Sequence, residues 1–370
     1  TAAVSDTGQT QQNAEGETEA AEDDDYIIAI LTGTVSQSEE SYAAAMRLYN
    51  EDPDHIVVAT YPDNFAAEQE TMISTALSFA ANPKVKAIVF SQAVAGAAAC
   101  FQKVKEIRPD ILCIAANYAD DTATIAENAD LCYVLDIPEF GNKLAEYAYD
   151  YGCSTVVFYT FARHLAIQTH ADRWENLQNR CDELGLNLVQ GTTPDPLGDA
   201  GVSGCQQYIL EDVPRMVDLY GVETGFSGSN TSQNEPMIKM VAETGSYFLL
   251  ASDPSPFLGF TAALGIEVPE EYAYDADYVV TAIKDKLAEI GMSGHMGSWT
   301  APINTLYLTG GVQYAYEYCR GVTNGEFLDP EVFQAAMAAA AGGDIVIYNV
   351  EFNGTTYDNC FYFMCEYEVY

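Results

Sequence analysis

The chain has 370 residues, of which 48% are hydrophobic and 19% are charged, a composition that excludes a wholly disordered or fibrous protein and suits two domains. Fifteen Lys and Arg residues against 55 Asp and Glu residues give a net charge of −40. Such a surface repels phosphate backbones and anionic lipid headgroups, which argues against a nucleic-acid partner and against membrane docking through basic patches. No segment approaches the roughly 18 to 20 uninterrupted apolar residues of a membrane span.

Residues 1–25 form an acidic segment with eight Asp and Glu residues, no Lys or Arg and no aromatic side chain. This segment buries too little apolar surface to offset its ordering entropy, so we predict a disordered tether. A tether of this kind is typical of exported lipoproteins, and we expect a lipid anchor at the N-terminus to be the link to a membrane. The alternative is a trimmed terminus without a role. Deletion of residues 1–24 is expected to leave stability and ligand affinity unchanged.

From residue 26 onward, short apolar runs alternate with longer amphipathic runs. The first series of predicted strands comprises 26–33, 55–62, 85–93, 110–117 and 129–136. The second series comprises 154–162, 186–195, 224–230 and 246–253. Continuous apolar strands with helices between them indicate parallel sheets that are covered on both faces.

Two such series favour an α/β fold with two doubly wound parallel-sheet lobes and a cleft between them, whereas a (β/α)8 barrel is the competing architecture. The tail from residue 344 argues against the barrel because it is predicted to form antiparallel strands joined by an Asn-Gly turn. The irregular segment 254–272 and two helices near 273–291 and 303–320 without a strand between them argue the same way. The predicted first lobe is 26–136 plus about 256–325, and the predicted second lobe is 137–255 plus about 326–370.

Sequence signatures of catalysis and metal binding are absent from the chain. It has no phosphate-binding P-loop, no GxGxxG, HExxH or GxSxG motif, and no CxxC or Cys/His cluster at zinc spacing. We therefore expect no catalytic residue, no metal and no cofactor. The nine scattered cysteines argue against a disulfide scaffold and leave open one bridge between Cys360 and Cys365.

Polar side chains follow most of the predicted strands. In an open parallel sheet, ligands bind beyond the carboxyl ends of the strands, and two facing lobes bring both sets of strand ends to one cleft. Hydroxyls, amides, a few carboxylates and one Arg suit a small polar ligand. The candidate ligand-binding residues are Thr34, Ser36, Ser38, Ser91, Gln92 and Asn117 in the first lobe, and Tyr159, Arg163, His164, Thr192, Asp195, Asn230 and Asp253 in the second.

Several candidates also have a purely structural interpretation. The hydroxyl run 32–38 either caps a helix or contacts the ligand, and a helix N-terminus also attracts anions. His164 either binds the ligand or occupies a capping or surface position, and Asp253 either caps a turn or accepts hydrogen bonds from the ligand. Arg163 has the strongest argument, because a strand-end cation in so acidic a chain offers a rigid fork of donors. We expect Arg163→Ala to weaken ligand binding with the fold intact and Arg163→Lys to recover little.

The segments YIIAILTGTVSQSEESYAAA, TYPDNFAAEQETMIS and KVKAIVFSQAVAGAAACFQKVKEIRPDI carry a family resemblance. They resemble the type I periplasmic-binding-protein fold and, more narrowly, an uncharacterised family of bacterial lipoproteins with that fold, found largely in clostridial-type anaerobes. The resemblance covers about residues 26–330. It implies a solute receptor, because strand-end positions supply the ligand contacts in related sugar, nucleoside and autoinducer receptors.

Together these patterns predict a monomeric, extracytoplasmic solute-binding lipoprotein that closes on a small polar ligand and delivers it to an ABC permease. A second hypothesis keeps the fold and makes the chain a sensor for a membrane signalling partner. A third is an α/β enzyme that uses the cleft carboxylates, which the missing motifs disfavour.

Overall fold

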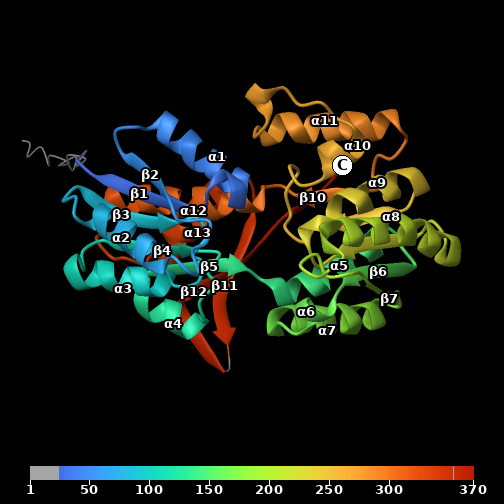
Figure 1. Cartoon of the computed structure of the whole chain (residues 1–370), viewed down its shortest axis with the longest axis horizontal. Helices are drawn as coiled ribbons and strands as arrows, with labels where there is room; N and C mark the ends of the chain where they lie inside the picture. The colour runs from blue at the N-terminus through green and yellow to red at the C-terminus, as the bar shows by residue number, and fades with distance from the viewer. Residues whose placement is uncertain (1–24, 353) are drawn as a thin grey trace, which may run out of the picture.

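The computed structural model describes residues 25–352 and 354–370, which form two α/β lobes (Figure 1). The predicted tether therefore lies outside the described residues, apart from Asp25. The strands of the first lobe are β1 (Ile27–Thr32), β2 (Ile56–Thr60), β3 (Val85–Phe90), β4 (Leu112–Ala116), β5 (Leu131–Leu135), β11 (Ile345–Phe352) and β12 (Thr355–Cys365). Its helices are α1 (Val35–Glu51), α2 (Gln69–Ala80), α3 (Ala97–Ile107), α4 (Thr122–Asn128), α12 (Ile303–Cys319) and α13 (Pro330–Ala341).

The second lobe carries the remaining elements. Its strands are β6 (Thr155–Thr160), β7 (Asn187–Thr192), β8 (Thr224–Gly228), β9 (Tyr247–Leu250), β10 (Gly297–Trp299) and β13 (Tyr367–Val369). Its helices are α5 (Ile137–Asp150), α6 (Ala162–Leu165), α7 (Gln168–Leu184), α8 (Gly201–Tyr220), α9 (Asn234–Thr244), α10 (Phe260–Leu264) and α11 (Ala276–Glu289), with short 3₁₀ turns η1 (Thr231–Gln233) and η2 (Glu270–Tyr272).

Each lobe is built on an open sheet. The first lobe has a seven-stranded sheet in the order β11-β12-β5-β4-β3-β1-β2, and the second a four-stranded sheet in the order β7-β6-β8-β9. Neighbouring strands in both sheets are parallel except β11, which is antiparallel to β12. The strand order reverses between β1 and β3 and between β6 and β8, which places a topological switch point in each lobe. The predicted class of two doubly wound lobes is confirmed.

The strands form where apolar residues are continuous, because helices cover both faces of each sheet. Ile28, Ala29 and Ile30 in β1, for example, are completely buried. Helix α5 begins at the point where the chain leaves the first lobe, and Asp136 caps it by accepting a hydrogen bond from the Glu139 amide over 2.8 Å. The cap fixes the start of α5, the first helix of the second lobe.

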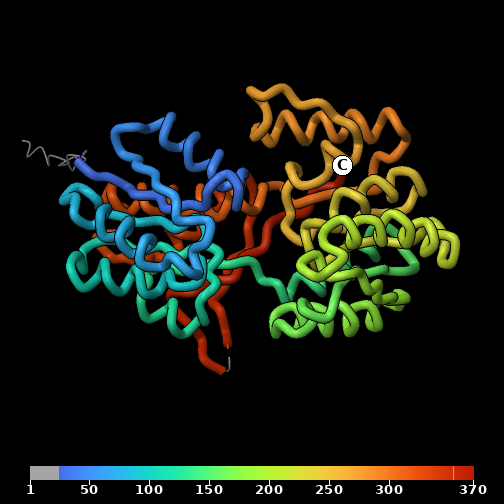
Figure 2. The backbone as a smooth tube through the Cα atoms, viewed as in Figure 1, coloured from blue at the N-terminus to red at the C-terminus, as the bar shows by residue number. Residues whose placement is uncertain are grey.

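The chain passes between the lobes after β5, between β10 and α12, and between β12 and β13 (Figure 2). The first crossing follows β5, and the later crossings lie at other positions than the predicted boundaries near 255–256 and 325–326. Residues 256–299 belong to the second lobe because Phe260 of α10 and Ile283 of α11 pack in the same core as Phe248 of β9. Residues 303–365 belong to the first lobe because α12 packs on β3 and β4, α13 packs on β11, and β11 and β12 are strands of its sheet.

The tail forms the predicted antiparallel pair, and β12 also pairs in parallel with β5. Asn353, of the expected Asn-Gly turn, lies outside the described residues. All nine cysteines are free thiols. The bridge between Cys360 and Cys365 does not form because both lie in β12, five residues and about 16 Å apart along the strand. Within the described ranges, no helix combines the length and the apolar character needed to cross a membrane.

Candidate functional site

A cavity of about 200 Å³ lies between the lobes at the carboxyl ends of their strands. Its residues come from the loops and helices that follow β4, β5, β6, β8 and β9, and from α12. They are Asn117, Leu135, Ile137, His164, His170, Arg173, Ser229, Asn230, Ser252, Asp253 and Tyr307. The cavity therefore lies where the strand-end rule places a ligand site in a doubly wound fold.

Arg173 of α7 provides a buried positive charge at this cavity. Its side chain is only 2% exposed and lies over the rings of Phe140 and Phe158, with the guanidinium carbon 5.9 and 5.1 Å from the two ring centroids. Among the described residues, the guanidinium makes one hydrogen bond, from Nη2 to Nδ1 of His170 at 3.0 Å, and its Nε has no partner. Burial lowers the pKa of Arg173 to about 10, so the group stays charged at neutral pH.

The position of Arg173 depends on a close approach between α5 and α7. Gly141 of α5 lies directly against the backbone of α7, where an added Cβ would meet the carbonyl oxygen of Arg173 at 2.1 Å. A side chain at position 141 would push α7 away, so glycine permits the close spacing of the two helices beside Arg173.

His164 and His170 form a stacked pair beside Arg173, with ring centroids 4.6 Å apart and planes inclined by 6°. Burial, followed by the charges of neighbouring arginines, lowers the pKa of His164 to about 4 and that of His170 to about 3. Both rings are therefore neutral at physiological pH. Because a guanidinium only donates, Nδ1 of His170 accepts from Arg173 and Nε2 carries the proton.

Asp253 provides a carboxylate at the same cavity, in the segment after β9. Its Oδ2 accepts hydrogen bonds from Thr231 Oγ1 at 2.6 Å and from Ser252 Oγ at 3.2 Å. No ion pair shorter than 4.0 Å joins Asp253 to Arg173 in the part of the chain that the structure describes, although the two charges are close enough to interact. The cavity thus carries opposite charges that do not neutralise each other by direct contact.

The first lobe contributes a different kind of wall. Leu135 and Tyr307 are almost fully buried, and the amide of Leu135 donates to the hydroxyl of Tyr307 over 3.1 Å. Asn117 follows β4 with a φ of +44°, the left-handed conformation that asparagine adopts more readily than most residues. This conformation turns the chain at the strand end beside the cavity.

The structure brings four of the thirteen predicted site residues to the cavity: Asn117, His164, Asn230 and Asp253. The side chain of Asn230 accepts hydrogen bonds from the amide and hydroxyl of Ser232, so it also caps the turn η1. Nδ1 of His164 lies 3.0 Å from the hydroxyl of Ser229. Capping and a place at the cavity coexist at these positions.

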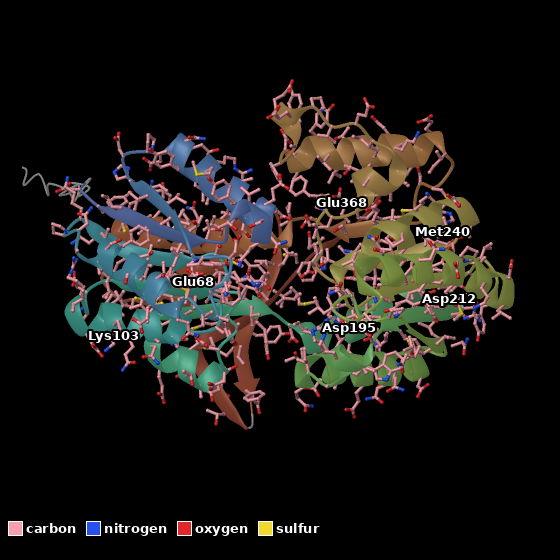
Figure 3. All side chains as sticks on the ribbon, in the orientation of Figure 1. Glu68, Lys103, Asp195, Asp212, Met240 and Glu368 are labelled. Carbon is pink, nitrogen blue, oxygen red and sulfur yellow. The ribbon has the colours of Figure 1, made fainter. Side chains whose placement is uncertain are left out.

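Arg163 and Asp195 lie outside the cavity wall and pair with each other, with Nε–Oδ2 and Nη2–Oδ1 distances of 2.7 and 2.8 Å. Figure 3 shows Asp195 on the side of the second lobe that faces the first. The pair still interacts electrostatically with His164. Arg163 and Asp195 therefore remain beside the cavity without lining it.

The candidates after β1 and β3 have partners within the first lobe. Thr34 and Ser36 donate to the carboxylate of Asp63, and Ser38 donates to Ser41. Ser91 donates to the hydroxyl of Thr32 at 2.9 Å, and Gln92 accepts from Tyr61 at 3.5 Å. These contacts connect loops of one lobe to each other.

Tyr159 and Thr192 do not meet the cavity. The hydroxyl of Tyr159 donates to Asp212 of α8 over 3.1 Å, and Figure 3 shows Asp212 on the side of its lobe away from the first lobe. Tyr159 lies within β6, where successive side chains point to opposite faces of the sheet, and its side chain points to the face that carries Asp212. Thr192 is the exposed last residue of the edge strand β7.

Sequence reasoning missed Arg173, His170 and Tyr307. His170 and Arg173 lie three residues apart, on one face of the first turns of α7. A cation and a histidine at this spacing, at the start of the helix after β6, could have indicated the pair. Tyr307 had no such signal, because α12 reaches the cleft only after the chain has returned to the first lobe.

A second, larger depression of about 760 Å³ lies between α1 and the segment that precedes α11. Its walls come from helix faces and from the crossing at 300–302, including Arg47, Glu51, Glu270 and Asp277. The strands of the two parallel sheets do not end at this depression, so the smaller cavity is the better candidate for the ligand site.

The two doubly wound lobes form a fold of the type I periplasmic-binding-protein kind. The chain belongs to the family described as "Protein of unknown function (DUF3798)", whose model matches residues 26–297. The resemblance to an uncharacterised family with this fold is confirmed.

Two proteins of Treponema pallidum (strain Nichols), each described as "Uncharacterized protein", are similar in sequence. One is 27% identical over 52% of this chain and 88% of its own length, and the other is 30% identical over 50% of this chain and 85% of its own length.

Solved structures show the same fold. A crystal structure described as a "Putative transcriptional regulator" from Clostridium difficile 630 has a TM-score of 0.86 and 24% identity, covering 94% of this chain and 99% of that chain. A sugar ABC transporter protein from Actinomyces odontolyticus has a TM-score of 0.55 and 9% identity over 82% of this chain and 86% of that chain. AraP, an arabinose-binding protein from Geobacillus stearothermophilus, has a TM-score of 0.50 and 11% identity, covering 83% of this chain and 93% of that chain.

Proposed function

We propose that this chain is an extracytoplasmic solute-binding receptor that closes on a small polar ligand, such as a sugar or nucleoside, and delivers it to an ABC permease. The observation that supports this most strongly is the cavity whose wall comes from both lobes. A ligand held there contacts both lobes at once, so it favours the closed form by its differential affinity for that form. The protein then binds its ligand without converting it, and needs no cofactor.

Two solved proteins with this fold are described as a sugar ABC transporter protein and an arabinose-binding protein. In the proposed arrangement the receptor is a monomer, held at the membrane by a lipid on its N-terminal segment. A net charge of −40 keeps the two lobes in solvent, because anionic headgroups repel them and direct adsorption to the membrane surface is unfavourable.

A second candidate function is that of a sensor whose closed form signals to a membrane partner. The similarity to a protein described as a transcriptional regulator favours ligand sensing as the alternative. Direct DNA binding fits poorly with a net charge of −40, because the negative phosphate backbone repels so acidic a protein. A sensor and a transport receptor share the ligand-dependent closure and differ in the partner that recognises the closed form.

The test of the proposed function is small-angle X-ray scattering combined with a thermal-shift screen. A ligand at 100 times its dissociation constant stabilises by about 2.7 kcal/mol, and closure reduces the radius of gyration. A panel of sugars, nucleosides and amino acids is expected to contain a solute that does both. An unchanged scattering profile at a concentration of solute that saturates the melting shift would contradict a closing receptor. Release of a converted product by the purified protein would favour the enzyme.

A further inference from the structure

The cavity between the lobes contains one cation and one carboxylate that are both incompletely paired. Each of the other six arginines has a carboxylate within 4.0 Å, whereas Arg173 has none among the described residues. A buried cation without an anion is costly, and an anionic group that enters the cavity offsets that cost. Arg173 therefore favours a ligand with a carboxylate or a similar anionic group.

Asp253 favours a positive group on the same ligand. The hydroxyls of Thr231 and Ser252 donate to its Oδ2, whereas no group of the described residues donates to its Oδ1. The stacked pair His164 and His170 is neutral, and the nearby Arg163 is neutralised by Asp195. The charges that remain at the cavity are one positive and one negative, a pattern complementary to a dipolar ligand.

The rest of the cavity wall includes apolar side chains from both lobes. Leu135 and Tyr307 come from the first lobe and Ile137 from the start of α5, and Asn117 is the amide that the first lobe adds. A sugar carries hydroxyls around its whole rim and would need hydrogen-bond partners from both lobes. A molecule with its charges at one end and a hydrocarbon part at the other matches a wall that combines Arg173 and Asp253 with Leu135 and Ile137.

The cavity volume of about 200 Å³ favours a small ligand. We propose that the ligand is a small zwitterion with an apolar part, an α-amino acid or a related amino-carboxylate, whose carboxylate binds Arg173 and whose ammonium binds Asp253. This assignment rests on the proposed receptor function and specifies its substrate class.

The experiment is a thermal-shift screen of the full-length chain against the twenty common L-amino acids, with galactose, ribose and adenosine as uncharged probes. At least one amino acid is expected to raise the melting temperature by a few degrees. For the strongest binder, the corresponding carboxylic acid without the amino group and the corresponding amine without the carboxylate are then titrated by calorimetry. Each analogue is expected to bind at least about tenfold more weakly, since each leaves one charged side chain unpaired.

Two variants test the same assignment from the protein side. Arg173→Gln and Asp253→Asn are each expected to weaken binding of that amino acid at least about tenfold, and Arg173→Lys is expected to recover part of the loss because it restores the charge without the fork. Arg180→Gln, on the same helix but paired with Glu146, is the matched control and is expected to leave binding unchanged. The analogue titrations use the unaltered protein, so they decide the question even if Arg173→Gln fails to fold.

The outcomes separate this inference from the proposed function. Binding of a sugar or of adenosine, with no response to any amino acid, overturns the zwitterion and leaves the receptor function standing. An amino acid whose deaminated or decarboxylated analogue binds equally well overturns the two-charge assignment. No response to any probe, in melting temperature or in radius of gyration, contradicts both.

Discussion

Arg163 and Asp195 form a two-point ion pair that joins the segments after β6 and β7, with distances of 2.7 and 2.8 Å between the paired atoms. The hydrogen bonds from Arg163 lower the pKa of Asp195 to about 2. The cation that lines the cavity is Arg173, and Arg163 lies beside the cavity. This arrangement changes what each arginine is expected to do.

We predict that Arg163→Ala leaves the urea midpoint of unfolding unchanged, since exposed ion pairs contribute little to stability. Its effect on ligand affinity is expected to be smaller than that of Arg173→Gln, because Asp195 already occupies two of the Arg163 donors. Calorimetric titration of both variants with the same ligand makes the comparison. Equal losses of affinity would place Arg163 in direct contact with the ligand.

His164 and His170 are expected to make the protein less stable as the pH falls from about 6.5 toward 4. The unfolded chain takes up a proton at each histidine near pH 6.5, whereas in the folded protein burial and the neighbouring arginines lower the pKa values to about 4 and 3. The unfolded state therefore binds more protons in this window, and the free energy of unfolding falls by up to about 1.4 kcal/mol per pH unit for each histidine.

Urea denaturation at pH 7, 6 and 5 checks this prediction. The double variant His164→Asn and His170→Asn is expected to lose less stability over that range than the unaltered protein. Parallel pH dependences in the two proteins would show that the histidines titrate normally.

Gly141→Ala is expected to destabilise the protein by about 1 to 3 kcal/mol, the usual cost of forcing atoms into a packed contact. The new Cβ would lie 2.1 Å from the carbonyl oxygen of Arg173, so α5 and α7 must separate. In an exposed helix the same change stabilises by about 1 kcal/mol, so the sign itself is diagnostic. Gly343→Ala, whose Cβ meets its nearest neighbour at 3.7 Å, is the control. A stability gain in Gly141→Ala, measured by urea denaturation, would contradict the close contact.

Ionisation of the buried Glu40 carboxyl is expected to lower the free energy of unfolding as the pH rises. It accepts hydrogen bonds from the Thr305 amide at 2.9 Å and from the hydroxyls of Thr305 and Ser255 at 3.2 and 3.1 Å, which ties α1 to α12 and to the segment after β9. Burial of this carboxyl, which is 6% exposed, raises its pKa. A raised pKa in the folded state gives stability that is complete below the unfolded value of about 4.5 and is lost as the pH rises through the folded value.

Glu40→Gln removes this titration and keeps the shape of the side chain. Relative to the unaltered protein, it is expected to gain stability between pH 4.5 and 8, as measured by urea denaturation. The exposed Glu326→Gln serves as the control. If the free energy of unfolding depends on pH in the same way in both variants, the prediction that ionised Glu40 destabilises the fold is wrong.

The thiols are expected to react only after unfolding. Eight of the nine cysteines are buried and Cys319 is half-buried, and burial raises the pKa of its thiol to about 12. Labelling with a chromogenic disulfide is expected to modify at most one thiol in the native protein and nine in urea. Rapid reaction of several thiols under native conditions would indicate an opened core.

Much of this protein is determined by local sequence pattern. Apolar runs such as YIIAILTG predict buried strands because a strand covered on both faces admits no polar alternation, and β1 to β9 lie where those runs occur. Regular alternation with helices then dictates parallel sheets, and parallel sheets dictate the edge at which a ligand site forms. Asn117, His164, Asn230 and Asp253 follow from that rule.

The tertiary structure decided the rest, since it depends on contacts between residues far apart in the chain. The pairing of β12 with β5, about 230 residues away, returns the tail to the first lobe, and no local pattern encodes that partner. Tyr159 and Arg163 both occupy the end of the β6 segment, yet the pleat turns Tyr159 toward Asp212, and Asp195 holds Arg163 at the edge. Gly141 lets α5 and α7 meet closely at the backbone of Arg173, which lines the cavity. Local sequence thus sets which edge of the sheets carries the site, and packing between distant segments selects the side chains that line it.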